Sequence, residues 1–272
     1  MCRWMAYSGS PIALEEMLYK PKHSLIDQSM SSKSLETPTN GDGFGIGWYG
    51  RRKEPAVYHS IRPAWNDYNL RDLAAEIETP IFLAHVRAAT LATVQETNCH
   101  PFRYGPWLFM HNGEIFEIEK FRRELLFAVD SKYFTNILGT TDSEIMFHLA
   151  LTFGLETDAP RALARMAGFV EKTGREHGVE QSLWMTVAAS DGQALYAARY
   201  ASDGDAPTLY HSRDIDDVYE LNPQLRQIIG RETRVIVSEP VGAYRDIWKS
   251  VPRNTLIRVE RGAVDLSAFS PE

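Results

Sequence analysis

Runs of apolar residues predict strands near both ends of the chain. Residues 2–8 predict a first strand, and residues 44–49 and 56–59 predict a hairpin around the basic turn Arg51-Arg52-Lys53. Asp191-Gly192 is a hairpin turn signal between two later strands. The remaining predicted strands cover residues 81–86, 107–111, 183–189, 194–200, 208–210, 234–237 and 256–259.

Helical spacing of apolar residues is concentrated in the middle of the chain. It predicts helices over residues 66–78, 117–127 and 159–176, and residues 11–34 predict a short helix and a loop. Thr141-Asp142-Ser143-Glu144 has the form of a capping box that opens another helix. Strands, then helices, then strands again do not give the alternation of a doubly wound sheet. We therefore expect an α+β fold of two packed, mainly antiparallel sheets with helices outside, formed by residues 1–272 as a single domain.

The charge and cysteine content exclude several classes of function. The net charge is −7 over 272 residues and the basic residues are not clustered, which argues against nucleic-acid binding. No apolar stretch reaches the roughly 18–20 residues of a membrane helix, and no signal peptide is evident. Cys2 and Cys99 do not make a disulfide framework. We therefore expect a cytoplasmic protein without a membrane partner.

A glycine pattern in the second predicted strand resembles a dinucleotide-binding motif. Residues 45–50 match G-x-G-x-x-G, but that motif should open a helix whose N-terminus meets the pyrophosphate. Here a charged turn and another predicted strand follow. Alternating glycines in a strand indicate instead that another backbone or a ligand approaches closely.

Cys2 follows the initiator methionine directly. A residue as small as cysteine normally allows removal of Met1, and Cys2 would then carry both a thiol and a free α-amine with a reference pKa of about 7.7–8.0. The amine could accept the thiol proton, directly or through a water, and so activate the sulfur as a nucleophile. The alternative is a small buried residue in a first strand.

Four further segments look unlike a generic core. Arg87 ends an apolar run, where an unpaired charge is costly, although a structural carboxylate could pair with it. Residues 98–102 form a compact polar turn. Asn112-Gly113 follows a predicted strand and could be a plain turn, and Asp142 could simply favour a helix N-terminus.

Together these residues fit one kind of site. A thiolate can attack a side-chain amide carbonyl, and an Asn side chain and a Gly backbone N–H can stabilise the oxyanion that forms. A guanidinium can hold a carboxylate in a bidentate pair, and a carboxylate can hold an ammonium group. The two charged ends are those of free glutamine or of a γ-glutamyl group.

The ordered set of motifs resembles the class II glutamine amidotransferases of the N-terminal-nucleophile hydrolase superfamily. Within them it is similar to the amidotransferase-like subunit of the yeast-type glutathione degradation complex and to stand-alone γ-glutamyl amidohydrolases. The resemblance covers nearly the whole chain and implies a four-layer αββα sandwich. The segments that carry it are Met1-Cys2-Arg3, residues 40–45, 85–90, 98–102, 111–113 and 141–144, Ser238-Glu239-Pro240, Trp248, and Val251-Pro252.

The resemblance also implies roles for individual residues. Cys2 matches the nucleophile and its α-amine the base, and Asn112 and Gly113 match the oxyanion hole. Substrate-binding positions are matched by Arg87 for the α-carboxylate with Thr90 nearby, Asp142 for the α-amine, and Asp42, Gly43 and His111 beside them. Thr186 and Gly41 depart from the residues that relatives often carry there, Asn and Ala.

The expected activity is hydrolysis of a γ-glutamyl amide through a thioester on Cys2, with no cofactor and no metal. The substrate is glutamine or a γ-glutamyl compound such as glutathione. The chain continues into no synthase-like segment before Glu272, so we expect that water or a separate partner is the acceptor. Two alternatives stay open: a subunit active only with a peptidase or synthase partner, and a non-catalytic γ-glutamyl-binding protein. Self-association into a homo-oligomer is also left open.

Overall fold

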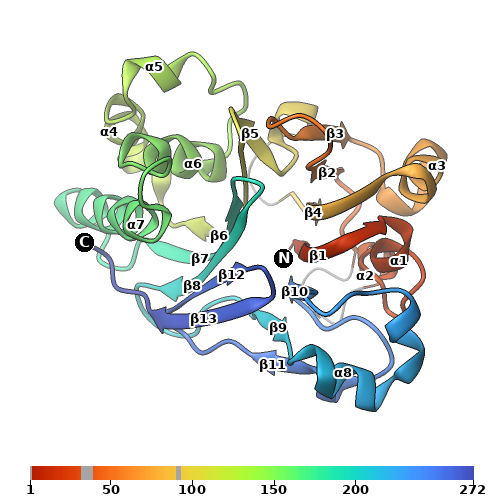
Figure 1. The fold of residues 1–272 in the computed structure, drawn as a ribbon. Coiled ribbons are helices and arrows are strands. Elements are labelled where there is room, and N and C mark those ends of the chain that lie inside the picture. Colours follow the sequence, from red (N-terminus) through yellow and green to blue (C-terminus); the bar gives the residue numbers. More distant parts are fainter. Residues whose placement is uncertain (1, 32–38, 90–92) are drawn as a thin grey trace.

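The strands form two antiparallel sheets. The structure is a computed structural model that describes residues 2–31, 39–89 and 93–272. Sheet one has the order β11-β9-β10-β1-β4-β2-β3, and sheet two the order β13-β12-β8-β7-β6-β5 (Figure 1). The strands of sheet one are β1 (Arg3–Ala13), β2 (Phe44–Trp48), β3 (Ala56–Ser60), β4 (Glu78–Val86), β9 (Tyr210–Ser212), β10 (Arg234–Val237) and β11 (Trp248–Ser250). Those of sheet two are β5 (Phe102–Tyr104), β6 (Trp107–Ile115), β7 (Leu183–Ser190), β8 (Ala194–Ala201), β12 (Thr255–Glu260) and β13 (Ala263–Ala268).

Helices cover the outer faces of both sheets. The helices are α1 (Glu15–Leu18), α2 (Leu25–Met30), α3 (Tyr68–Glu76), α4 (Arg122–Phe127), α5 (Ser131–Phe134), α6 (Asp142–Thr152), α7 (Ala159–Glu176) and α8 (Ile215–Leu221). The first three pack on sheet one and α4 to α7 on sheet two, with α8 near β9 and β11 (Figure 1). The expected α+β fold with an αββα arrangement is therefore confirmed. No helix among the described residues is long and apolar enough to cross a membrane.

Strand β1 is buried on both faces because it lies between a helical layer and the second sheet. Trp4 and Ala6 belong to the core between the sheets, whereas Met5 and Tyr7 pack toward the helices. Alternation of side chains along a strand produces this division. The same rule turns the side chains of Cys2, His85 and Asn112 toward the space between the sheets, since Trp4, Leu83 and Met110 two residues away lie there.

Several elements differ from the sequence-based expectation. Strand β1 continues through Ala13, where a polar helix and loop were expected, and α8 was not predicted. Residues 117–127 are not one helix, because Phe121 has φ of −141° between a 3₁₀ turn and α4. Asn112-Gly113 does not end its strand, because pairing of β6 with β7 continues to Ile115 opposite Leu183.

The glycines of β2 serve close packing and open no helix. A Cβ on Gly45 would lie 2.2 Å from the carbonyl oxygen of His100 and 2.4 Å from His59 Cδ2. The loop before β5 therefore rests directly on the strand. By contrast, Gly50, after the end of β2, has no neighbouring atom within 4 Å of such a Cβ.

We predict that Gly45→Ala lowers the free energy of unfolding by about 1–3 kcal/mol, because an added methyl group must displace backbone. Gly50→Ala is the matched control and should be neutral or slightly stabilising. Urea denaturation of both variants against the unchanged protein measures the effect. Equal stability of the two variants would contradict the close approach at Gly45.

Candidate active site

The thiol of Cys2 is held by the backbone of Ala88. The Ala88 N–H points to Cys2 Sγ at 3.3 Å, and the sulfur lies 3.4 Å from the Ala88 carbonyl oxygen. This contact arises because β1 and β4 pair with Arg3 opposite Val86, so the chain leaving β4 passes the start of β1. Burial raises the pKa of the Cys2 thiol, and the Ala88 N–H and the guanidinium groups of Arg87 and Arg3 oppose that rise.

The side chain of Asn112 lies across from Cys2 on sheet two. Its Nδ2 donates to the Cys2 carbonyl oxygen at 2.8 Å, and its Oδ1 lies 3.0 Å from His85 Nε2. The next residue, Gly113, has φ of +142°, and a Cβ there would lie 1.8 Å from the Trp184 carbonyl oxygen. Only glycine fits this backbone position.

Arg87 is buried directly after β4 and is supported by residues 42 and 43. The Arg87 N–H donates to Gly43 O at 2.8 Å, and its carbonyl oxygen accepts from the Asp42 N–H at 3.0 Å. The Asp42 carboxylate accepts from the Ala89 N–H at 2.8 Å. Asp42 and Gly43 thus fix the segment that carries Arg87 without lining the pocket themselves. Thr90, the other residue predicted here, lies outside the described residues.

Asp142 is the first residue of α6, and a network of hydrogen bonds fixes its position. Its carboxylate accepts from the Ile115 N–H at 2.9 Å and from the Ser143 N–H at 2.7 Å. His111 Nε2 faces the Trp184 carbonyl oxygen at 3.4 Å, and its Nδ1 lies 2.8 Å from Ser143 Oγ, whose hydroxyl donates to the Asp142 carboxylate at 3.1 Å. His111 therefore faces α6 rather than Cys2.

One pocket of about 370 Å³ collects most of the predicted residues, and its lining includes Cys2, Arg87, His111, Asn112, Gly113 and Asp142. Residues far apart in the sequence thus meet at one end of the two sheets. Among residues 2–31, 39–89 and 93–272 no cluster of His, Cys, Asp or Glu could hold a metal ion.

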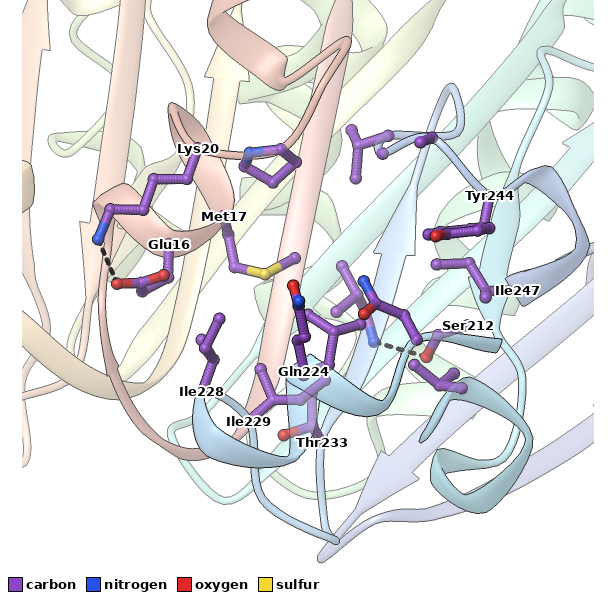
Figure 2. Close-up of a pocket in the computed structure, with 18 of the residues that line it drawn as sticks. Glu16, Met17, Lys20, Ser212, Gln224, Ile228, Ile229, Thr233, Tyr244 and Ile247 are labelled. Atoms are coloured by element: carbon purple, nitrogen blue, oxygen red, sulfur yellow. Dashed lines mark hydrogen bonds and ion pairs between the residues drawn. The ribbon is translucent and has the colours of Figure 1, made fainter. Parts of the chain in front are cut away.

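A second, more apolar cavity of about 480 Å³ lies elsewhere, between α1 and the segment around α8 (Figure 2). Met17, Ile228, Ile229 and Ile247 contribute to its walls. Lys20 lies at its edge, where Glu16 binds its ammonium group (Figure 2). Among the described residues its lining includes no Cys, and of the segments that carry the family resemblance it includes Trp248.

Sequence reasoning gave no role to Ser238 and Glu239, and the structure supplies one. Ser238 Oγ accepts from the Trp4 N–H at 2.9 Å, and Glu239 binds Arg3 Nε at 2.8 Å and also contacts His23. These contacts fix the beginning of β1 beside Cys2. The rule that a buried charge needs a partner, applied to Arg87, would also have predicted an acidic partner for Arg3.

Two further contacts were missed by sequence reasoning. Asn98 accepts from the Thr140 N–H at 2.8 Å and so connects the turn at residues 98–102 to the start of α6. Glu144 accepts from the Leu138 N–H at 2.9 Å and the Gly139 N–H at 2.7 Å, whereas Thr141 caps α6 through the Glu144 N–H. Only half of the predicted capping box is therefore formed.

Thr186, which departs from the family pattern, accepts from the Trp4 indole N–H at 3.3 Å.

Comparisons with known proteins identify the family of the chain. A family model described as glutamine amidotransferases class-II matches residues 22–272. The chain belongs to this family of enzymes. It is 33% identical to a probable glutamine amidotransferase, DUG3, of Saccharomyces cerevisiae, over 100% of this chain and 85% of that protein. It is 27% identical to a γ-glutamyl-hercynylcysteine sulfoxide hydrolase of Mycolicibacterium smegmatis, over 79% of this chain and 84% of that protein.

Solved structures of class II amidotransferases share the fold. A glutamine aminotransferase class-II domain protein of Silicibacter pomeroyi is 33% identical, with a TM-score of 0.74 over 99% of this chain and 100% of that one. Glutamine phosphoribosylpyrophosphate amidotransferase of B. subtilis has a TM-score of 0.67 at 13% identity, over 100% of this chain and 50% of that one, which shows the fold alone. Enzymes of this amidotransferase family act on small-molecule substrates.

The buried histidines predict how the stability of this amidotransferase-family chain depends on pH. Burial lowers the pKa of His85 to about 3 and also lowers the pKa of His100 and His111. Below about pH 6.5 these histidines are therefore protonated in the unfolded chain but stay neutral in the folded protein. The free energy of unfolding should be at its maximum above about pH 6.5 and fall below it, by up to about 1.4 kcal/mol per pH unit for each histidine.

Urea denaturation between pH 7.5 and 5.5 measures this dependence. Because both ring nitrogens of His100 lack a hydrogen-bond partner among the described residues, His100→Phe should reduce the slope without breaking a hydrogen bond. A slope that is unchanged in His100→Phe would contradict the neutral state assigned to that ring.

Proposed function

We propose that the protein hydrolyses the γ-amide bond of glutamine or of a γ-glutamyl compound, with Cys2 as nucleophile after removal of Met1. The observation that carries the proposal is the convergence of Cys2, the Asn112 amide, Arg87 and Asp142 on one pocket. Such a pocket holds a nucleophile, a donor for an oxyanion and two opposite charges. Membership of the class II family supports the same chemistry.

The sequence of bond changes follows from these groups. The thiol proton of Cys2 passes to the freed α-amine of the same residue, and the resulting thiolate attacks the γ-carbonyl carbon. The oxyanion receives hydrogen bonds from the Asn112 amide and the Gly113 N–H. On collapse the C–N bond breaks, the amine base returns its proton to the leaving nitrogen, and a thioester remains. Water then hydrolyses the thioester to glutamate and the free thiol.

Two charged residues select the glutamyl end of the substrate. The Arg87 guanidinium, buried beside the pocket, would bind the α-carboxylate, and the Asp142 carboxylate would bind the α-ammonium group. The Mycolicibacterium smegmatis relative supports water as the acceptor, since it is named as a hydrolase of a γ-glutamyl compound. We therefore propose hydrolysis rather than transfer to a bound acceptor.

Replacement of Cys2 by Ala tests the proposal directly. We expect Cys2→Ala to lower the release of glutamate from L-glutamine or glutathione by at least about 10³-fold, because the nucleophile is lost. Thermal unfolding should be little changed. Cys99→Ser is the matched control and should keep its activity, since Cys99 is buried and bonded to the Ser60 and Gln95 carbonyl oxygens. Full activity of Cys2→Ala would disprove the mechanism.

Replacement of Arg87 tests substrate binding. We expect Arg87→Met to raise KM for the γ-glutamyl substrate about 10- to 100-fold, because a charged hydrogen-bond donor to the α-carboxylate is lost. Arg103→Met is the control, since Arg103 is exposed and its Nη1 donates to the Pro55 carbonyl oxygen at 3.1 Å. Steady-state kinetics on both variants decide the matter, and an unchanged KM in Arg87→Met would exclude the carboxylate role.

A further inference from the structure

His85 lies between the sheets, next to the amide of Asn112. It is 1% exposed, and strand alternation along β4 directs its ring inward. Its Nε2 lies 3.0 Å from Asn112 Oδ1, whereas its Nδ1 has no hydrogen-bond partner among the described residues. No hydrogen bond connects the ring to Cys2 Sγ in the part of the chain that the structure describes. The geometry therefore connects His85 to the nucleophile only through Asn112.

The orientation of the Asn112 amide decides whether it can serve as an oxyanion donor. With Nδ2 toward Cys2, the amide donates to the Cys2 carbonyl oxygen at 2.8 Å and keeps a second N–H. With the amide turned over, two carbonyl-type oxygens would face each other at that distance, and no N–H would face the nucleophile. The orientation with Nδ2 toward Cys2 places Asn112 Oδ1 opposite His85 Nε2, and a proton on Nε2 makes His85 the donor to that oxygen.

The environment of His85 keeps that donor in place. Burial lowers the pKa of the His85 ring, and the positive charge of Arg87 lowers it further, whereas the hydrogen bond to Asn112 offsets only part of the effect. The His100 ring lies 4.3 Å away, centroid to centroid, and has no hydrogen-bond partner in the part of the chain that the structure describes. A neutral imidazole has one N–H, and among the described residues only Nε2 has a hydrogen-bond partner, the Asn112 Oδ1. The Nε2–H tautomer is therefore the form in which no donor is left unsatisfied.

We propose that His85 is a positioning residue that fixes the Asn112 amide with its N–H groups toward the nucleophile. One N–H binds the Cys2 carbonyl oxygen, and the other remains for the oxygen of the reacting amide. This rests on the proposed function, in which Asn112 stabilises the oxyanion. The effect of His85 is on the transition state, since the charged ends of the substrate are bound by other residues.

Kinetics of two variants test the role. His85→Phe keeps the volume and removes the donor, and we expect kcat to fall up to about 10²- to 10³-fold, as on loss of an oxyanion donor. KM and the inhibition constant of glutamate should stay within about twofold, because ground-state binding is unchanged. His85→Gln retains an N–H donor and should recover most of kcat. The rate of Cys2 alkylation by iodoacetamide, which forms no oxyanion, should be the same in all three proteins.

A matched control separates this role from general loss of packing. His148 is also a buried histidine with an unpartnered ring nitrogen, but its Nδ1 bonds to the Glu144 carbonyl oxygen within α6. His148→Phe should leave kcat within about twofold of the unchanged protein. If KM rises as kcat falls in His85→Phe, or if Gln rescues no better than Phe, the positioning role is wrong.

The protonation state of His85 gives a test that needs no turnover. Nitrogen-15 NMR of the unchanged protein at pH 7 should show the His85 proton on Nε2, with Nδ1 bare. The chemical shift of the Asn112 side-chain amide should change in His85→Phe and return to its original value in His85→Gln. A proton on Nδ1 would overturn the inference. Absence of turnover on every γ-glutamyl substrate, with Nε2 protonated, would instead disprove the proposed function.

Discussion

Pairing of β1 with its two neighbours is the constraint on which the site depends. β1 lies between β10 and β4 in the middle of sheet one, so its first residues cannot move independently of the core. The Arg3–Glu239 ion pair and the Ser238 contact with Trp4 hold the β10 side, and pairing of Arg3 with Val86 holds the β4 side. A nucleophile at the start of such a strand is fixed by tertiary structure rather than by a loop of its own.

The space between the sheets combines an apolar core with a polar end. Away from the pocket it is filled by residues such as Trp4, Leu83 and Met110. Toward the pocket the same strand faces continue with Cys2, His85 and Asn112. Polar groups in such a position are costly unless paired, and most of them are paired with one another. The packing and hydrogen bonds that stabilise the two-sheet sandwich therefore also orient the groups proposed to react.

The sequence predicted the elements whose signals are local. Helix α7 was predicted with the same bounds that the structure shows, because the spacing of its apolar residues lies within one segment. The hairpin of β2 and β3, the turn at Asp191-Gly192 and the absence of a dinucleotide-binding helix after Gly45 also depend on local residues.

What the sequence could not supply depends on contacts between distant segments. Strand β1 extends past Pro11 because β4 pairs with it as far as Glu78. Asn112 and Gly113 stay in β6 because β7 lies opposite. The pairing of Arg3 with Glu239 joins residues 236 positions apart, and no local sequence pattern in either segment predicts this partner. Motif resemblance indicated which residues belong together, and the fold explains how they meet.

The central claim is that Cys2 becomes a glutamine-reactive N-terminal nucleophile. The most direct measurement is the intact mass of the protein after incubation with 6-diazo-5-oxo-norleucine, a glutamine analogue that alkylates such nucleophiles. We predict a chain without Met1 that carries one adduct, on the Cys2 peptide, and no adduct on Cys2→Ala. A processed chain that hydrolyses γ-glutamyl amides but takes up no adduct on Cys2, or an equal adduct on Cys2→Ala, would contradict the account.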